Sequence, residues 1–231
     1  MPNGRFNTGD LINIMKELVV FDLDGTLVYG QSQKLFLGYL IGKKLIGRLF
    51  YMRLMMWFML YKLELVRDPK KPMEYAFSFL KGRAEKEIAS IVADFFETSL
   101  RQHIYNDAKG IMDKHRREDR EIIILSNAIE PIVKKVAEHF GIVGYVCTRL
   151  EVVDGLYTGK VLDIVYGKNK TASLKRFAED QGFDLERAWA YADHSSDQYI
   201  LASVGHPTAV NPTPKLSRIA RERNWPVLDL K

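Results

Sequence analysis

The chain has 231 residues, of which 47% are hydrophobic, so it can bury one sizeable core together with an inserted subdomain. Its formal net charge of +5 favours anionic partners such as phosphorylated substrates, nucleic acid or anionic lipid. Cys147 is the only cysteine, which excludes an internal disulfide and predicts a reducing, cytoplasmic setting. The first ten residues lack an apolar signal region and are expected to be loosely ordered, and residues 1–14 are expected to be an extension without a catalytic role.

The predicted elements begin with a short buried strand and continue as a long helical stretch. Residues 19–21 form an apolar run, which predicts the strand. From residue 30 to about 103 the pattern is helical, most clearly over 75–80 and 85–100. Two proline-containing pairs, Asp68-Pro69 and Lys71-Pro72, predict a break between helices.

Strands and helices alternate in the rest of the chain, and Asp154-Gly155 predicts a hairpin turn between two of the strands. In chain order we predict a strand over 121–125, a helix over 131–139, hairpin strands over 146–152 and 156–161, a helix over 170–181, and strands over 188–192, 207–210 and 226–228. This alternation implies an α/β fold with a mostly parallel, Rossmann-like sheet. The core comprises residues 15–29 and 105–231, and residues 30–104 form an inserted helical cap.

Two aspartates follow the first strand where the chain turns. Asp22 and Asp24 flank Leu23 and precede Gly25-Thr26. Side chains at i and i+2 of an extended segment share a face, so both carboxylates point to one place. In an open α/β sheet that place is the ligand crevice at the carboxyl ends of the strands. There, one carboxylate can attack phosphorus while the other handles the leaving-group proton.

Two further sites can hold phosphate oxygens. Ser126 and Asn127 follow the strand that ends at Leu125, where a hydroxyl and backbone N–H groups are available. Lys170 lies at the start of a helix, and its ammonium can neutralise charge on a transferring phosphoryl group. Lys168 competes for this role, and Lys170 fits better because it lies nearer the helix that follows.

A second pair of carboxylates follows the strand over 188–192. Asp193 and Asp197 lie four residues apart, so in a helical turn they face the same side. Such hard oxygen ligands suit Mg²⁺. Between them, His194 is expected to fill the loop rather than to take part in the chemistry.

In this order, the four sites resemble the motifs of the haloacid dehalogenase superfamily of phosphohydrolases. The similarity is to its phosphoserine-phosphatase-like branch, in which a helical cap is inserted between the first two motifs. The resemblance covers the whole predicted core and implies a Mg²⁺-dependent phosphatase.

The resemblance also implies a mechanism. Asp22 attacks phosphorus and forms an aspartyl-phosphate, while Asp24 protonates the leaving oxygen and then activates water. The remaining roles are phosphate binding by Ser126, Asn127 and Lys170, Mg²⁺ binding by Asp22, the main-chain carbonyl of Asp24 and Asp193, and support of the metal by Asp197.

The cap is the region expected to select the substrate. It carries no Asp or Glu from Gly25 to Leu63, and residues 49–60 are almost entirely apolar. That segment is too short to span a bilayer, and packed cap core is favoured over a helix on an anionic membrane surface. Phosphoserine phosphatases carry a Glu shortly after the first motif, whereas this chain has the neutral Gln31.

Three functions follow from these observations. The leading one is hydrolysis of a small phosphorylated metabolite, of the phosphoserine type. The second is a lipid-phosphate phosphatase with a phosphatidylglycerophosphate-like substrate, bound peripherally at the inner membrane surface. The third, a non-catalytic nucleic-acid or phosphate-binding protein, is disfavoured because no basic motif interleaved with aromatic residues is visible. We therefore expect a small phosphorylated substrate and no nucleic acid.

Overall fold

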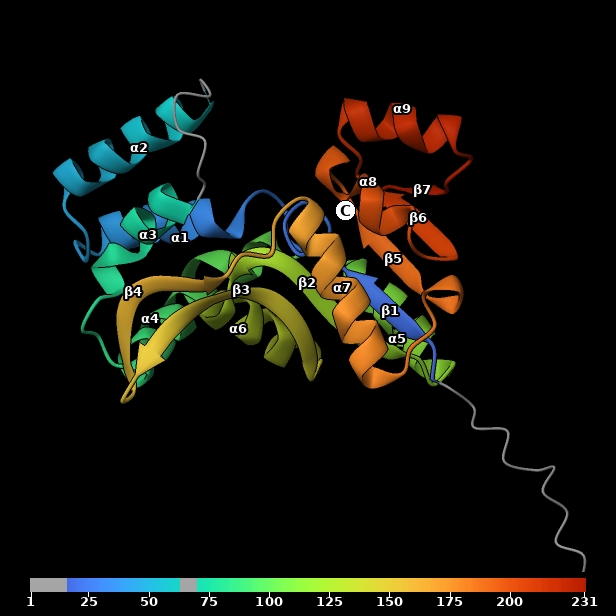
Figure 1. Ribbon diagram of the computed structural model, residues 1–231, viewed down its shortest axis with the longest axis horizontal. Helices are drawn as coiled ribbons and strands as arrows, with labels where there is room; N and C mark the ends of the chain where they lie inside the picture. Colours follow the sequence, from blue (N-terminus) through green and yellow to red (C-terminus); the bar gives the residue numbers. More distant parts are fainter. Residues whose placement is uncertain (1–15, 63–69) are drawn as a thin grey trace, which may run out of the picture.

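A seven-stranded sheet in the order β4-β3-β2-β1-β5-β6-β7 forms the centre of the molecule. The computed structural model describes residues 16–62 and 70–231 (Figure 1). The strands are β1 (Leu18–Phe21), β2 (Glu121–Ile129), β3 (Gly144–Val153), β4 (Leu156–Asp163), β5 (Trp189–Ala192), β6 (His206–Val210) and β7 (Val227–Leu228). Neighbouring strands are parallel except β3 and β4, which pair antiparallel. The predicted α/β fold with a mostly parallel sheet is confirmed.

Helices flank both faces of this sheet. We call the first four helices after β1 the cap helices: α1 (Ser32–Gly42), α2 (Arg48–Lys62), α3 (Lys70–Phe77) and α4 (Glu85–Phe95). The others are α5 (Ala108–Arg117), α6 (Glu130–Phe140), α7 (Lys168–Gln181), α8 (Gln198–Leu201) and α9 (Pro214–Glu222). Helices α5 and α6 lie on one side of the sheet, and α7 to α9 lie on the other (Figure 1). The division into a core of residues 15–29 and 105–231 and a cap of residues 30–104 stays a prediction.

The central position of β1 in the sheet explains why all four of its residues are apolar. Its four residues are all buried. Val19 and Phe21 pack into the cluster beneath α5 and α6, whereas Leu18 and Val20 pack into the cluster beneath α7 to α9. A strand covered on both faces needs apolar side chains at every position.

The hairpin between β3 and β4 forms as predicted. Asp154 and Gly155 both adopt positive φ, at 51° and 74°, which suits a two-residue hairpin turn. The hairpin reaches the cap helices, because Gly82 N–H donates to the Tyr157 carbonyl at 2.8 Å.

Several predicted boundaries differ from the structure. Strand β2 continues past Leu125 to Ile129, with a shift in its register against β3 after Ser126. The helix expected over 85–100 ends at Phe95 and continues as a π-helical turn. Pro72 lies in the first turn of α3 and does not break it, because the N–H that proline lacks has no helical partner there.

Other features fall outside the predictions or outside the structure's range. Helices α5 and α9 were not predicted from the sequence. The expectations for residues 1–14 and for a break at Asp68-Pro69 lie outside the described residues. Within the described ranges, none of the helices has the length and apolar character needed to cross a membrane.

Candidate active site

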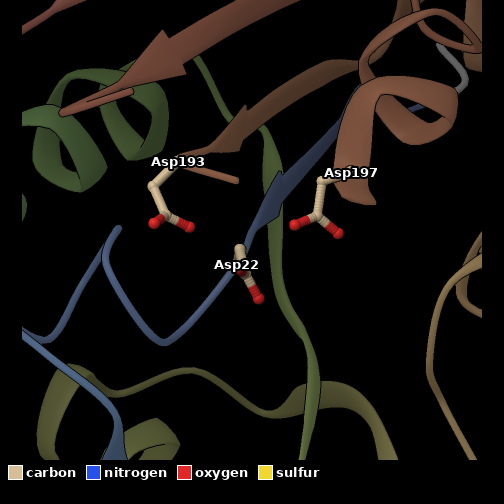
Figure 2. A group of neighbouring side chains, drawn as sticks. All are labelled: Asp22, Asp193 and Asp197. Atoms are coloured by element: carbon tan, nitrogen blue, oxygen red, sulfur yellow. The ribbon is translucent and has the colours of Figure 1, made fainter. Parts of the chain in front are cut away.

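Three carboxylates converge at the carboxyl edge of the central strands. Asp22 directly follows β1, and Asp193 directly follows β5, its parallel neighbour. The Asp22 N–H donates to the Tyr191 carbonyl at 2.9 Å, which fixes the end of one strand against the other. Oxygens of Asp22, Asp193 and Asp197 lie within 4.8 Å of one another, with Asp22 between the other two (Figure 2).

Lys170, from the first turn of α7, supplies a positive charge to this group. Its Nζ donates to Oδ1 of Asp22 at 2.7 Å and to Oδ1 of Asp197 at 2.9 Å. The residue is only 5% exposed. Burial opposes the charged form, but the two carboxylates outweigh it and raise the pKa of Lys170. The ammonium therefore stays charged and links both aspartates, and its predicted binding of phosphate stays a prediction.

The group has three carboxyl groups for one ammonium. Burial raises the pKa of Asp22, and the Asp197 and Asp193 charges raise it further against the opposing effect of Lys170. Burial and Asp197 likewise raise the pKa of Asp193 to about 7. Crowded, buried carboxylates with a single ammonium accommodate a divalent cation, and their hard oxygens are the ligands that Mg²⁺ prefers. The residues present therefore fit the predicted metal.

Asp24 has a separate environment on the cap side. Its Oδ1 accepts a hydrogen bond from the backbone N–H of Ser32, the first residue of α1, at 2.7 Å. Burial raises the pKa of Asp24, while the Ser32 N–H lowers it. A carboxyl group with a raised pKa, bonded to the first residue of the cap helices, can give and take a proton at neutral pH.

Gly25 allows the loop after β1 to pass beside Asp193. Its φ is +80°, and a Cβ at this position would lie 2.1 Å from Oδ2 of Asp193. A side chain here would therefore displace Asp193 as well as strain the backbone.

Ser126 and Asn127 lie at the same edge of the sheet, but their hydrogen bonds are to residues other than the aspartates and Lys170. Ser126 is fully buried, and its Oγ accepts from the Ala128 N–H at 3.1 Å. The Asn127 carbonyl accepts from the Gln33 side chain of α1 at 3.4 Å. Both stay predicted phosphate-binding residues.

Sequence reasoning missed the residues that position the aspartates. The Thr213 N–H donates to the Asp193 carbonyl at 2.9 Å, just before α9. Ser32 was also missed as the partner of Asp24. The only available signal for Thr213 was its place after a predicted strand, at the edge where the site forms. His194 accepts from the Ser196 N–H at 3.2 Å and so caps the short helical turn that carries Asp197, as expected of a loop residue.

Comparisons with known proteins agree with this geometry. The sequence profile of the haloacid dehalogenase-like hydrolases matches residues 19–202. The chain is 31% identical over 216 residues to the inhibition of morphological differentiation protein of Streptomyces azureus, covering 90% of this chain and 76% of that one. It is 28% identical over 237 residues to a histidinol-phosphatase of Neisseria meningitidis, covering 94% and 100%. A phosphoserine phosphatase of Mycobacterium tuberculosis is 26% identical over 220 residues, covering 91% and 70%.

Solved structures share the fold. A Bordetella pertussis protein of unknown function matches with a TM-score of 0.84 and 23% identity, over 93% of this chain and 99% of that one. A phosphoserine phosphatase in its apo form matches with a TM-score of 0.63 and 18% identity, over 94% of each chain. The predictions of the family and of an enzyme of the phosphatase class are confirmed. With its sheet, its converging aspartates and its profile match in agreement, the chain belongs to the haloacid dehalogenase-like hydrolase family.

Proposed function

We propose that this phosphatase hydrolyses small phosphomonoesters in two steps, through an aspartyl-phosphate on Asp22, with Mg²⁺ as cofactor. One observation carries the proposal: Asp22 is bonded to the Lys170 ammonium among the carboxylates, whereas Asp24 is bonded to the Ser32 N–H at the start of the cap helix α1. The two aspartates of one motif therefore have environments suited to a nucleophile and to an acid.

In the first step, a carboxylate oxygen of Asp22 attacks phosphorus. The bond between phosphorus and the ester oxygen breaks, and Asp24 gives its proton to the departing alcohol. Lys170 lies 2.7 Å from Asp22, so its charge is in place to oppose the negative charge of the phosphoryl group.

In the second step, Asp24 is a carboxylate and acts as the base. It takes a proton from a water molecule, whose oxygen attacks the phosphorus of the aspartyl-phosphate. The acyl-phosphate bond breaks, phosphate leaves, and both aspartates return to their starting states. Mg²⁺ held by Asp22 and Asp193, with Asp197 beside them, would supply the charge that lets a phosphate dianion approach these carboxylates.

The relatives support a small substrate with an amine. The names phosphoserine phosphatase and histidinol-phosphatase both denote enzymes for phosphate esters of amino alcohols. We propose the same class for this chain. Its cap offers the exposed, neutral Gln31 just before α1, so a second group would have to balance the ammonium of such a substrate.

A test is phosphate release from phosphoserine, histidinol phosphate and glycerol 3-phosphate, each with Mg²⁺ and with a chelator. We expect Mg²⁺-dependent turnover that favours an amino-alcohol ester and is lost in Asp22→Asn. The matched control is Asp180→Asn on the exposed side of α7, which should keep full activity. Equal turnover by Asp22→Asn would contradict the nucleophile, and full activity in the chelator would contradict the metal.

A further inference from the structure

Helix α2 has two apolar faces, of which only one packs against the described part of the protein. In Figure 1 it lies at the outer end of the cap helices, away from the sheet. Its inner face carries Leu54, which is 2% exposed, and Phe50, whose ring stacks on Tyr75 with 5.2 Å between centroids. The expectation of packed cap core is confirmed for this face.

The opposite face is a stripe of exposed apolar side chains. It consists of Leu49, Met52, Met56 and Met59, which are 56%, 59%, 50% and 57% exposed. Their spacing of three, four and three residues aligns them along one side of the helix. For this outer stripe the expectation of packed core is wrong, because no described element covers it.

Basic side chains border the outer stripe on both sides. At 100° per residue, Arg48 and Arg53 fall to either side of the line through Met52 and Met56. Both arginines are exposed, and neither forms an ion pair with any residue in the described ranges. No acidic residue occurs between positions 25 and 63 of the sequence. The outer face of α2 is thus apolar along its centre and positively charged at its margins.

A second basic helix stands along the same side of the molecule. Helix α9 exposes Lys215, Arg218 and Arg221, and its acidic residue Glu222 pairs with Arg218 at 3.9 Å, which leaves the helix with two net positive charges. In Figure 1, α2 and α9 both lie along the upper edge of the view. This side therefore offers positive charge from two elements that are far apart in the sequence.

We propose that the outer face of α2 is a docking surface for an anionic phospholipid bilayer. Apolar side chains of this helix would enter the boundary between headgroups and acyl chains while the arginines contact lipid phosphates. Charge complementarity selects this occupant over a second copy of the chain. A two-fold pairing of α2 would bring the same basic set to both sides of the interface, which is repulsive. Binding through this surface does not depend on the proposed reaction, and it would place the enzyme at the bilayer.

The test is co-sedimentation of the full chain with vesicles, either of phosphatidylcholine alone or of an equal mixture with phosphatidylglycerol. We expect binding to the mixed vesicles only, with release at about 0.5 M NaCl because salt screens the attraction. Arg48→Gln/Arg53→Gln should bind roughly twentyfold more weakly. Met52→Ser/Met56→Ser should bind roughly tenfold more weakly, because the apolar contact is lost.

Matched controls come from exposed residues elsewhere. Val143→Ser/Leu162→Ser removes two exposed apolar side chains from the surface of the α/β unit. Lys175→Gln/Arg176→Gln removes two exposed charges from α7. Both should bind like the unmodified chain. All variants should hydrolyse a soluble phosphomonoester at the unmodified rate, which separates docking from catalysis.

Two results would overturn the proposal. One is a lack of binding to the mixed vesicles, or binding that the α2 variants leave unchanged. The other is a dimer in sedimentation equilibrium that Met52→Ser/Met56→Ser dissociates while vesicle binding is absent, which would assign the face to a second copy.

Discussion

The charged side chains of the candidate active site are largely buried and close to one another, whereas those on the outer face of α2 are exposed. At the site, Lys170 is buried and bonded to two aspartates, and the pKa values of Asp22 and Asp193 are raised by burial and by neighbouring carboxylates. On α2, the arginines are exposed and apolar side chains face outward. This difference supports our proposals that the carboxylates at the edge of the sheet carry out the reaction and that the outer face of α2 binds a membrane. Substitutions at the site should change every substrate's chemistry, and substitutions on α2 should change none.

The largest effect should come from Asp24→Asn, which removes the acid but keeps the shape. We expect the rate for an alkyl phosphate to fall about 10⁴-fold, because the alcohol leaves poorly without a proton. For p-nitrophenyl phosphate, whose leaving group needs no proton, the loss in the first step should be far smaller, although the second step loses its base with both substrates. The rate of alcohol or p-nitrophenol release in the first turnover measures this difference. Equal losses on the two would contradict the assignment of Asp24 as the acid.

The second-largest effect should come from Lys170→Met, which we expect to lower kcat about 10³-fold. It also leaves Asp22 and Asp197 buried without their shared ammonium, so the free energy of unfolding should fall by about 3–5 kcal/mol. Activity assays and urea unfolding test both effects. Lys175→Met on the exposed side of the same helix is the control, and it should change neither quantity.

Gly25→Ala should lower kcat/KM roughly a hundredfold, because the new methyl group would displace Asp193 from the site. Gly82→Ala is a matched control, since Gly82 has a similar φ of +79° and no atom near its added Cβ. It carries the same backbone strain and should lose stability without a comparable loss of activity. If both variants lost activity alike, the contact with Asp193 would not be the cause.

The smallest effect on the reaction should come from His115, which lies beneath β5, on the far side from α7. Its Nε2 is 2.8 Å from the Tyr191 hydroxyl, and Arg120 donates to its Nδ1 at 3.1 Å. Burial, with the Arg120 charge, lowers the pKa of His115 from 6.5 to about 4. Between these two pH values the unfolded chain binds a proton that the folded chain does not.

The free energy of unfolding should therefore decrease as the pH falls from 6.5 towards 4, and His115 should account for up to about 3 kcal/mol of this decrease. His115→Gln should make the dependence shallower while leaving kcat at pH 7.5 within about twofold. Urea unfolding at several pH values measures it. An unchanged slope in the variant would contradict the assignment of this group.

Much of the site could be predicted because parallel strands end at one edge. Asp22 follows β1 and Asp193 follows β5, so the alternation of strands and helices was enough to bring them together. Lys170 was predicted to bind phosphate from its place at the start of a helix. Its Nζ lies 2.7 Å from Asp22, and its role towards phosphate stays a prediction.

The remaining contacts depend on packing that local patterns do not encode. The hydrogen bond from Ser32 to Asp24 requires α1 to begin directly over the loop after β1, and the Asp197 contact requires α7 and the turn after β5 to meet. The exposure of the outer face of α2 could not be predicted from the sequence either. An apolar sequence predicts burial for all its faces, and only the arrangement of neighbouring elements leaves the outer stripe exposed.

The central claim is that Asp22 becomes phosphorylated during turnover. The most direct measurement is rapid quenching of the reaction, followed by borohydride reduction and peptide mass spectrometry. An aspartyl-phosphate is reduced to homoserine, so the account predicts homoserine at position 22, formed only when substrate is present and not in Asp22→Asn. Homoserine at another position, or none during proven turnover, would contradict the account.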